Sequence, residues 1–493
     1  MAKTYFIGID GGTQSTKIVM YDTNGNVVCE GKENLKPLCL APPDVVEHPE
    51  DDLWDTLKIA GKRLMAAFKG DVKDIAGVGV GSIRCCRVLL KKDGTLSAPV
   101  INWQDGRTAR AYEHVIPETA YVTSTAGYLI HRLTGCFNDA ASNYFGQWPI
   151  DYRTWQWNEN KAEFQKYNIP REMLFNVFMP GTVVGNVTKA AAAATGLPEG
   201  LPVVCTTSDK SVEALGAGLL DDKQAVISLG TYIALMVMGK DLPVNPQSFW
   251  PIMSSIPERI IYEGYGIRRG MWTVSWFRDL LGETPVKKAA SLGLSTEAFL
   301  DREAAALVPA GSDGLMTVLD WLANPWEPYK RGVMIGFMAH MSYPWLYRSI
   351  LEGIVYTLKN NFDAMMSELG TSVDSLIITG GGSNSGLFMQ IFADVFGLPV
   401  RRNVINGTAS VGAVVNTAVA TGVYPNYEEA VRHMVRIRDT FTPKPENRAV
   451  YEKLNAQVYR HITGYTDEVL KKSFGVLRED LKPDASLKSW SPT

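Results

Sequence analysis

The carboxylate of Asp10 stands at the end of an apolar stretch and is followed at once by a glycine-rich turn. Residues 4–9 read Thr-Tyr-Phe-Ile-Gly-Ile and predict a β-strand, and Asp10-Gly11-Gly12-Thr13-Gln14-Ser15 comes directly after them. Glycine lets backbone N–H groups approach a phosphate closely, and the hydroxyls of Thr13 and Ser15 add further donors. A carboxylate beside such a turn can hold Mg²⁺ directly or through water. The segment therefore predicts a phosphate and magnesium site, with an ordinary loop as the alternative.

Two further glycine turns stand in similar places later in the chain. Gly230-Thr231 connects the apolar segments 225–229 and 232–238, and a plain β-turn is the alternative to a second phosphate clamp. Gly380-Gly381-Gly382 follows the apolar segment 375–379 and precedes a helix, a geometry that suits close approach of a nucleotide. A flexible connection is the alternative there. The chain has neither G-x-x-x-x-G-K-[ST] nor G-x-G-x-x-G, so neither the P-loop nor the dinucleotide fingerprint applies.

Two other groups could act on a hydroxyl compound. Asp209 follows the apolar segment 202–205 and precedes a helix, so it is either an N-cap or a general base that accepts a hydroxyl proton. Trp103-Gln104-Asp105-Gly106-Arg107 combines an aromatic ring, an amide, a carboxylate and a guanidinium. Sugars need such a mixture, because their hydroxyls want directional partners while their C–H faces stack on rings. A surface turn is the alternative for this second group.

Two similar halves are expected to position these groups. Strands predicted at Lys17–Tyr21 and 27–31 make the opening of the chain a three-stranded antiparallel unit. The same strand, glycine turn and strand recur near residue 230, and strands alternate with helices elsewhere. The pattern predicts an α/β fold whose two halves meet at a cleft, with domains at 1–218 and 219–493.

Composition narrows the class of partner. The 493 residues carry 49 Lys and Arg against 52 Asp and Glu, a formal net charge of −3 without any block of like charge, which argues against nucleic acid as a partner. The six cysteines include no C-x-x-C pair, so a disulfide framework and a structural zinc site are not expected. The small apolar run 190–194 is far too short to span a membrane, and no signal peptide is expected. We expect a cytoplasmic protein with a small-molecule partner and no membrane contact.

Taken together, the motifs resemble those of the FGGY family of carbohydrate kinases over nearly the whole chain. The family's first phosphate loop is similar to residues 8–17, its W-x-D-x-R motif to Trp103–Arg107, and its catalytic aspartate falls on Asp209. Its second phosphate turn matches Gly230-Thr231, and its adenosine motif matches Gly380–Asn384 together with Ser385. The resemblance implies two actin-like (ribonuclease-H-like) ATPase domains that flank a cleft.

The resemblance also implies an activity, which is the ATP-dependent phosphorylation of a hydroxyl on a small sugar or polyol of the pentulose, hexulose or alditol class. Asp209 would be the general base, and Asp10 would hold Mg²⁺. The implied ATP-binding residues are Gly11, Gly12, Thr13, Gln14, Ser15, Gly230, Thr231, Gly381, Gly382, Asn384 and Ser385. The implied acceptor-binding residues are Arg84, Trp103, Gln104, Asp105 and Asp209. A homodimer is compatible with this assignment.

Two departures from the family pattern bear on the acceptor. Glycerol kinases carry an Arg-Glu pair where this chain has Arg84-Cys85, which argues against glycerol. The stretch from Asp105 to Leu133 is too short for the family's helix pair and K-L-x-W signature, so the N-terminal substrate lobe is expected to be shortened. Residues 347–349 and 486–490 resemble autoinducer-2 kinases. An autoinducer-2 type kinase and a non-catalytic nucleotide-binding relative are therefore the alternatives.

Overall fold

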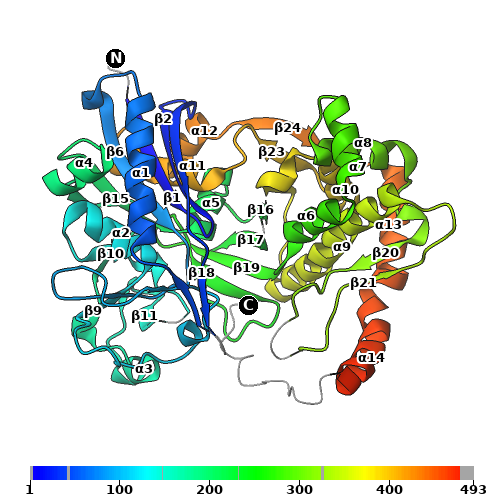
Figure 1. Ribbon diagram of the computed structural model, residues 1–493, viewed down its shortest axis with the longest axis horizontal. Coiled ribbons are helices and arrows are strands. Elements are labelled where there is room, and N and C mark those ends of the chain that lie inside the picture. The colour runs from blue at the N-terminus through cyan, green and yellow to red at the C-terminus, as the bar shows by residue number, and fades with distance from the viewer. Residues whose placement is uncertain (1–3, 42–44, 147, 231, 324–326, 478–493) are drawn as a thin grey trace.

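Two mixed β-sheets, each packed against helices, lie side by side in the computed structural model (Figure 1). The structure describes residues 4–41, 45–146, 148–230, 232–323 and 327–477. The N-terminal half, coloured blue to green in Figure 1, contains a six-stranded sheet, and the C-terminal half contains a seven-stranded sheet.

The first sheet has the strand order β14-β15-β6-β1-β2-β3. Its hairpin strands β1, β2 and β3 are antiparallel, whereas β6 and β15 run parallel to β1, and β14 closes the edge in the antiparallel sense. The strands predicted near residues 4–9, 17–21 and 27–31 are confirmed. The bounds are β1 Tyr5–Gly11, β2 Ser15–Asp22, β3 Val27–Asn34, β6 Ile75–Ser82, β14 Thr182–Asn186 and β15 Pro202–Ser208.

The second sheet repeats this arrangement, with the order β18-β19-β17-β16-β22-β23-β24. β16, β17 and β19 are antiparallel like the first hairpin strands, and β22 and β23 run parallel to β16. The prediction of two similar halves is confirmed, because strand order and direction match between the sheets. The bounds are β16 Gln224–Leu229, β17 Ile233–Gly239, β18 Phe249–Met253, β19 Ile260–Ile267, β22 Ser375–Thr379, β23 Val400–Asn403 and β24 Ile437–Phe441.

Helices pack on the two sheets, and short strand pairs build the lower part of the N-terminal half in Figure 1. The helices of the first half are α1 Asp52–Ala67, α2 Thr125–Thr134, α3 Lys161–Tyr167, α4 Lys189–Thr195 and α5 Asp209–Ala217. Those of the second are α6 Gly270–Leu280, α7 Glu283–Ser291, α8 Thr296–Leu307, α9 Tyr343–Leu369, α10 Gly386–Phe396, α11 Thr408–Ala420, α12 Tyr427–Met434, α13 Pro445–Leu454 and α14 Arg460–Leu477. The short strands are β4 Cys39–Ala41, β5 Val45–His48, β7 Val88–Leu90, β8 Val100–Ile101, β9 Tyr121–Thr123, β10 Asn138–Ala140, β11 Ile150–Asp151, β12 Gln156–Trp157, β13 Asn176–Phe178, β20 Met316–Val318 and β21 Val333–Ile335.

One helix of each half, α5 and α11, packs against the sheet of the other half. Ala214 and Ala217 of α5 join a buried cluster with Val226 of β16 and Ile377 of β22. In the opposite direction, α11 carries apolar side chains onto β1 and β2 of the first sheet, in a cluster that contains Phe6, Val19, Tyr21, Val411, Val414, Val415 and Ala418. Neither half therefore buries its own apolar surface alone.

Glycines allow α5 and α11 to cross at backbone contact. A Cβ atom on Gly216 would lie 1.9 Å from the carbonyl oxygen of Thr408, and one on Gly412 would lie 1.9 Å from that of Val212. The first sheet meets α11 as closely, since a Cβ on Gly8 would lie 2.3 Å from the Ser410 carbonyl oxygen. Real Cβ atoms do not come this close to other atoms, so glycine is required at these contacts.

The predicted division between residues 218 and 219 stays a prediction. It is compatible with the end of α5 at Ala217, where Gly218 adopts a left-handed conformation with φ 98°. The C-terminal tail continues as helices α13 and α14. Among the described residues, no helix is long and apolar enough to cross a membrane.

We predict that Gly412→Ala destabilises the protein, because the new methyl group would overlap the α5 backbone. The expected loss is about 1–3 kcal/mol of unfolding free energy, typical of overpacking, and it would lower the melting temperature by several degrees. Thermal denaturation followed by circular dichroism measures it.

Gly464→Ala is the matched control, since Gly464 lies inside α14 and a Cβ there would meet nothing within 4 Å. This variant is expected to gain up to about 1 kcal/mol from better helix propensity. Equal melting temperatures for Gly412→Ala and the wild type would contradict the packing described for α5 and α11.

Candidate active site

The carboxyl ends of three parallel strands of the first sheet meet at one edge. Asp10 of β1 pairs with Gly81 of β6, and Ser82 at the end of β6 pairs with Ser208 at the end of β15. Asp209 follows Ser208 as the first residue of α5. Ligands of open α/β sheets bind beyond the carboxyl ends of such strands. The topology thus brings the two carboxylates singled out in the sequence, Asp10 and Asp209, to the same edge.

The turn from Gly11 to Ser15 is a tight hairpin between β1 and β2. The Gly12 N–H donates to the carbonyl oxygen of Ser15 at 3.0 Å. The Gly11 carbonyl oxygen accepts from the Ile83 N–H at 2.8 Å, which ties the turn to the end of β6. Gln14 is exposed at the tip, whereas Thr13 and Ser15 are half-buried. The predicted phosphate-binding residues are therefore held together on a turn that is anchored at both ends.

The second sheet presents a matching edge. Ser228 of β16 pairs with Thr379 of β22, so that Gly230 and Gly380 follow two neighbouring parallel strands. Gly380 has φ 81°, and a Cβ on it would lie 2.6 Å from the Leu229 carbonyl oxygen, so this position requires glycine. Thr231, which was predicted to bind phosphate beside Gly230, lies outside the described residues.

The segment after Gly380 forms a 3₁₀ turn, Gly381–Asn384, that leads into α10. Gly381 and Asn384 are exposed, and a Cβ on Gly381 would meet nothing within 4 Å. The hydroxyl of Ser385 caps α10 by accepting from the Phe388 N–H at 2.9 Å. The Asn384 amide oxygen accepts from Asn406 at 2.6 Å. The predicted adenosine motif is thus an ordered, open turn at a helix N-terminus, and its role in binding stays a prediction.

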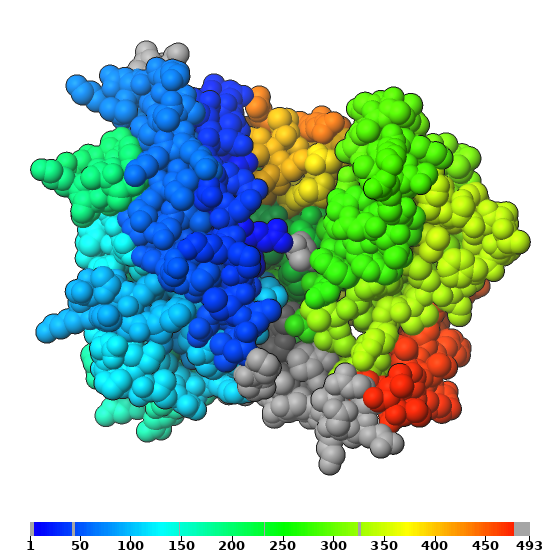
Figure 2. Space-filling view, in the orientation of Figure 1, coloured from blue at the N-terminus to red at the C-terminus, as the bar shows by residue number. Residues whose placement is uncertain are grey.

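The first turn of α5 connects the two edges. Lys210 Nζ donates to Ser228 Oγ at 2.9 Å and to Glu213 at 3.0 Å. Glu213 in turn accepts from Thr379 Oγ1 at 2.8 Å. Figure 2 shows a groove between the two halves of the molecule, with the deep-blue N-terminal segment on its wall. The carboxyl edges of the two sheets therefore face each other, joined by side chains of α5.

Negative charge accumulates at this junction. Burial, followed by the nearby carboxylates of Asp209 and Glu213, raises the pKa of Asp10 to about 7, although Lys210 and Lys17 act in the opposite direction. Burial also raises the pKa of Asp209, against the effect of Lys210 and Arg84. Carboxylates that raise one another's pKa favour a cation between them. Among the described residues, no group of three or more His, Cys, Asp or Glu could by itself hold a metal.

Asp209 does not cap its helix. Ser208 is the N-cap residue of α5, and no side chain makes a capping hydrogen bond there. Asp209 Oδ1 is buried and has no hydrogen-bond partner among the described residues. Buried oxygens in native proteins nearly always have a partner, so an unpaired carboxylate oxygen at a strand end needs an explanation. The capping interpretation is wrong, and an incoming hydroxyl would satisfy this oxygen.

Arg84 is held by a carboxylate from the other half. It donates to both oxygens of Glu263 on β19, at 2.5 and 2.6 Å, and its guanidinium lies 5.7 Å from the centre of the Phe145 ring. Glu263 has no exposed side-chain surface, and that of Arg84 is 14% exposed. The carboxylate that pairs with Arg84 thus comes from a strand of the second half of the chain.

Hydrogen bonds to Asp105 hold the Trp103–Arg107 segment in place. The two oxygens of buried Asp105 accept from Val46 N at 2.7 Å and from Arg107, whose Nε and Nη2 lie 2.9 and 2.7 Å away. Trp103 is half-buried and packs on the core of the first half, while Gln104 is exposed. Asp105 therefore orients this loop. Contact of Asp105 with an acceptor stays a prediction and would require it to give up one of these bonds.

The predicted shortening is visible where the chain leaves this loop. Between the 3₁₀ turn Gly106–Ala109 and α2, the chain forms only the three-residue strand β9 and no helix. The family's helix pair was expected to be missing from this stretch. Residues 110–124 therefore contain no counterpart of that helix pair.

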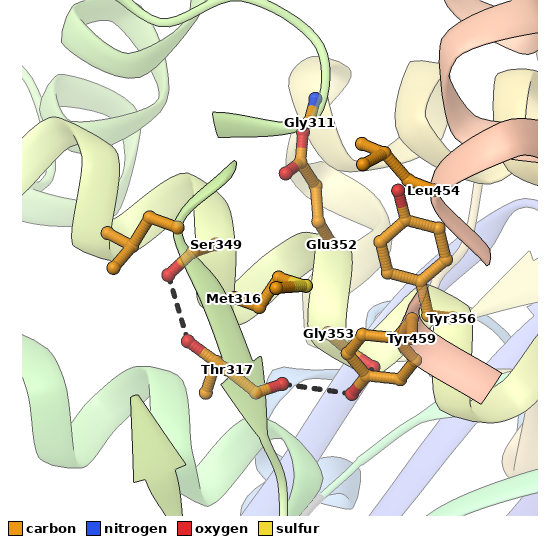
Figure 3. Close-up of a pocket in the computed structure, with 10 residues that line it drawn as sticks. Gly311, Met316, Thr317, Ser349, Glu352, Gly353, Tyr356, Leu454 and Tyr459 are labelled. Atoms are coloured by element: carbon orange, nitrogen blue, oxygen red, sulfur yellow. Dashed lines mark hydrogen bonds between the residues drawn. The ribbon is translucent and has the colours of Figure 1, made fainter. Parts of the chain in front are cut away.

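A small internal cavity lies elsewhere, in the second half between β20, α9 and α13 (Figure 3). Thr317 and Ser349 share a hydrogen bond of 2.8 Å there, and the Tyr459 hydroxyl donates to the Thr317 carbonyl oxygen at 2.9 Å. Glu352 on its wall is engaged by Arg348, Ser312 and Tyr451. These groups satisfy one another, whereas the buried Tyr356 hydroxyl on the same cavity has no hydrogen-bond partner among the described residues.

Three charged residues of the site were not predicted. Lys210 and Glu213 lie three residues apart in the first turn of a helix, a spacing that predicts an ion pair. Glu263 is the charged residue in the largely buried strand Ile260–Ile267, which was a usable signal for a functional or paired carboxylate. The pairing of Glu263 with Arg84 could not have been predicted, because the two residues lie in different halves of the chain.

Comparison with known proteins identifies the family. The model of the C-terminal domain of the FGGY family of carbohydrate kinases matches residues 225–421. The model of the N-terminal domain matches in two pieces, 5–121 and 114–216, which meet at the shortened stretch. The chain belongs to the FGGY family of carbohydrate kinases. The predicted family and the assignment as an enzyme, a carbohydrate kinase that binds ATP, are confirmed.

The kinase is 60% identical over 491 residues to a protein named uncharacterized sugar kinase YgcE from Escherichia coli K12, and the match covers 100% of both chains. It is 25% identical to an autoinducer-2 kinase of Klebsiella pneumoniae, over 95% of this chain and 96% of that one. The solved structure of xylulose kinase from Rhodospirillum rubrum matches with a TM-score of 0.81 at 22% identity, over 95% of this chain and 100% of that one. The predicted actin-like two-domain fold is confirmed.

We predict that Glu263→Gln strongly destabilises the kinase, because it leaves the Arg84 guanidinium in the groove without its counter-charge. Removing one partner of a buried ion pair costs about 3–5 kcal/mol. Urea denaturation of Arg84→Met, Glu263→Met and the double variant Arg84→Met/Glu263→Met, alongside Glu263→Gln, measures the coupling. The double variant should recover most of the unfolding free energy that the single variants lose. A loss in the double variant equal to the sum of the two single losses would contradict the pairing.

Proposed function

We propose that the kinase transfers the γ-phosphoryl group of ATP to a hydroxyl of a small, uncharged sugar or polyol of the pentulose, hexulose or alditol class. Asp209 is the general base, and the turns at Gly11–Ser15, Gly230-Thr231 and Gly381–Ser385 hold the nucleotide. The observation that carries the proposal is the unpaired, buried oxygen of Asp209, placed beside Asp10 at the edge where the glycine turns converge.

The proposed reaction is a single in-line transfer. The acceptor oxygen forms a bond to the γ-phosphorus while the bond from that phosphorus to the β,γ-bridging oxygen breaks, and ADP leaves with the electron pair. The hydroxyl proton goes to Asp209. A raised pKa makes this carboxylate a stronger base than an exposed aspartate, since burial disfavours its charged form. Backbone N–H groups of the turns face the phosphates, so no basic patch is needed.

Magnesium fits the charges of the groove. Asp10 is the proposed ligand, because the proximity of Asp209 and Glu213 contributes to its raised pKa of about 7 and a divalent cation would offset that repulsion. Mg²⁺ usually binds through one or two carboxylates, waters and substrate phosphates, so a protein cage of three ligands is not required. When bound, it would neutralise charge on the phosphates.

An uncharged acceptor is favoured because the two cations that act on Asp209 among the described residues, Arg84 and Lys210, already have carboxylate partners. Arg84 is paired with Glu263, and Lys210 with Glu213. With Asp10 and Asp209, four carboxylates face two cations. A sugar acid would add negative charge without finding a free guanidinium fork, whereas hydroxyls can bond to any of these groups. Trp103 and Gln104 would contact the acceptor from the side that lacks the helix pair.

Each of the two alternative functions, an autoinducer-2 type kinase and a non-catalytic nucleotide-binding protein, is supported by one observation. The 25% identical autoinducer-2 kinase supports a linear dione acceptor at the same site. The missing helix pair supports a non-catalytic nucleotide-binding role, but a protein with that role has no use for an unpaired buried carboxylate at Asp209. Catalysis on a sugar or polyol therefore accounts for more of the site.

An acceptor panel tests the proposal. ADP release from Mg-ATP is measured with pentuloses, hexuloses, alditols, autoinducer-2 and an aldonate, with ATP alone as the blank. Acceptor-dependent ADP release with a neutral sugar or polyol is expected, and release with autoinducer-2 alone would assign the first alternative. No acceptor-dependent release across the panel would overturn the proposal.

We predict that Asp209→Asn lowers turnover by a factor of about 10² to 10⁴, the usual contribution of a general base, because the amide cannot accept the hydroxyl proton. The affinity for ATP, measured by calorimetry, should change little. Glu30→Gln, which removes an exposed carboxylate paired with Lys17, is the matched control and should keep full turnover. Unchanged turnover in Asp209→Asn would remove Asp209 as the base.

A further inference from the structure

The ammonium group of Lys210 lies where the carboxyl edges of the two sheets face each other. It follows Asp209 in α5 and reaches Ser228 Oγ at 2.9 Å, two residues before Gly230. Its other partner, Glu213, contacts Thr379 immediately before Gly380. The side chain is 13% exposed, so it is largely enclosed between the turns proposed to hold the phosphates.

The ion pair with Glu213 accounts only in part for a lysine at this position, because Asp10 and Asp209 add two further carboxylates on which the lysine acts. The N-terminus of a helix carries partial positive charge, which disfavours a cation in its first turn. Lys210 is nonetheless the second residue of α5 and is largely removed from water. Its bond to Ser228 is to a neutral hydroxyl, which any polar side chain of similar length could replace. The position is better explained by a charge that binds there.

Lys210 also has one N–H donor that the contacts among the described residues do not use. An ammonium group has three N–H donors, and the contacts found among the described residues use two of them, to Glu213 and Ser228. The group acts electrostatically on both Asp10 and Asp209. Lys17, the other lysine that acts on Asp10, is instead paired with Glu30 at 2.8 Å and is 38% exposed. Of these two lysines, only Lys210 is enclosed in the groove.

We infer that Lys210 is a catalytic residue that binds the γ-phosphoryl group of ATP and stabilises its charge during transfer. The inference rests on the proposed function and adds a side-chain cation to the backbone donors and Mg²⁺. Lys210 gives up no proton, because the bond that breaks is the one to the β,γ-bridging oxygen and the hydroxyl proton goes to Asp209. Its third N–H donates to a phosphoryl oxygen, while Glu213 and Ser228 keep the ammonium in place.

The test compares nucleotides that differ in the γ-group. Affinities for Mg-AMP-PNP and Mg-ADP are measured by calorimetry for the wild type, Lys210→Gln and Lys210→Arg, together with kcat and KM. Loss of a charge-assisted hydrogen bond should weaken Lys210→Gln for AMP-PNP by about ten-fold or more, with far less change for ADP. Its kcat should fall about a hundred-fold, as on removal of one transition-state donor. Lys210→Arg should recover part of the AMP-PNP affinity and part of kcat.

Lys472→Gln is the control, since it removes an exposed lysine of α14 that pairs with Glu468, and it should change both affinities by no more than about two-fold. If Lys210→Gln does not fold, Lys210→Met, which keeps the side-chain stem, takes its place. Equal losses for AMP-PNP and ADP with a lowered melting temperature would show a structural tie and overturn the inference. An unchanged ratio of the affinities for AMP-PNP and ADP in Lys210→Gln would also overturn the inference. Failure of the proposed function is separate, because it would appear as an inactive wild type.

Discussion

The exchange of α5 and α11 between the two halves is the contact on which the rest of the structure depends. Each helix buries apolar side chains against the opposite sheet, and the two cross with their backbones in contact at Gly216 and Gly412. A side chain at either glycine would push the helices apart. Because α5 begins at Asp209, the same contact that joins the halves also fixes the proposed general base at their junction.

This constraint explains the chemistry of the groove. The repeated sheet topology puts one glycine turn after β1 and a second after β16, and the exchanged helices turn both edges toward each other. In the proposed reaction, backbone groups hold the phosphates from both sides, while Asp209 and Lys210 of α5 act as the base and the cation. Burial, followed by the neighbouring carboxylates of Asp209 and Glu213, raises the pKa of Asp10 to about 7, and a bound Mg²⁺ ion would offset the negative charge of these groups.

Local signals predicted most of the fold and part of the site. Asp10 with its glycine turn, Asp209 after a strand and the repeated hairpin could be found because each depends on neighbouring residues and the period of a strand. Glu263 was missed because its meaning comes from Arg84, far away in the sequence. Asp105 was found, but only the structure reveals that Arg107 and Val46 occupy both of its oxygens. Pairings across the two halves cannot be predicted from local patterns.

A crystal structure of the kinase with Mg-AMP-PNP tests the central claim most directly, that the facing sheet edges form the phosphoryl-transfer site. The account predicts the triphosphate along the turns at Gly11–Ser15, Gly230 and Gly380, with the metal at Asp10 and the terminal phosphate between Asp209 and Lys210. A triphosphate bound away from Asp10 and Asp209 would contradict it.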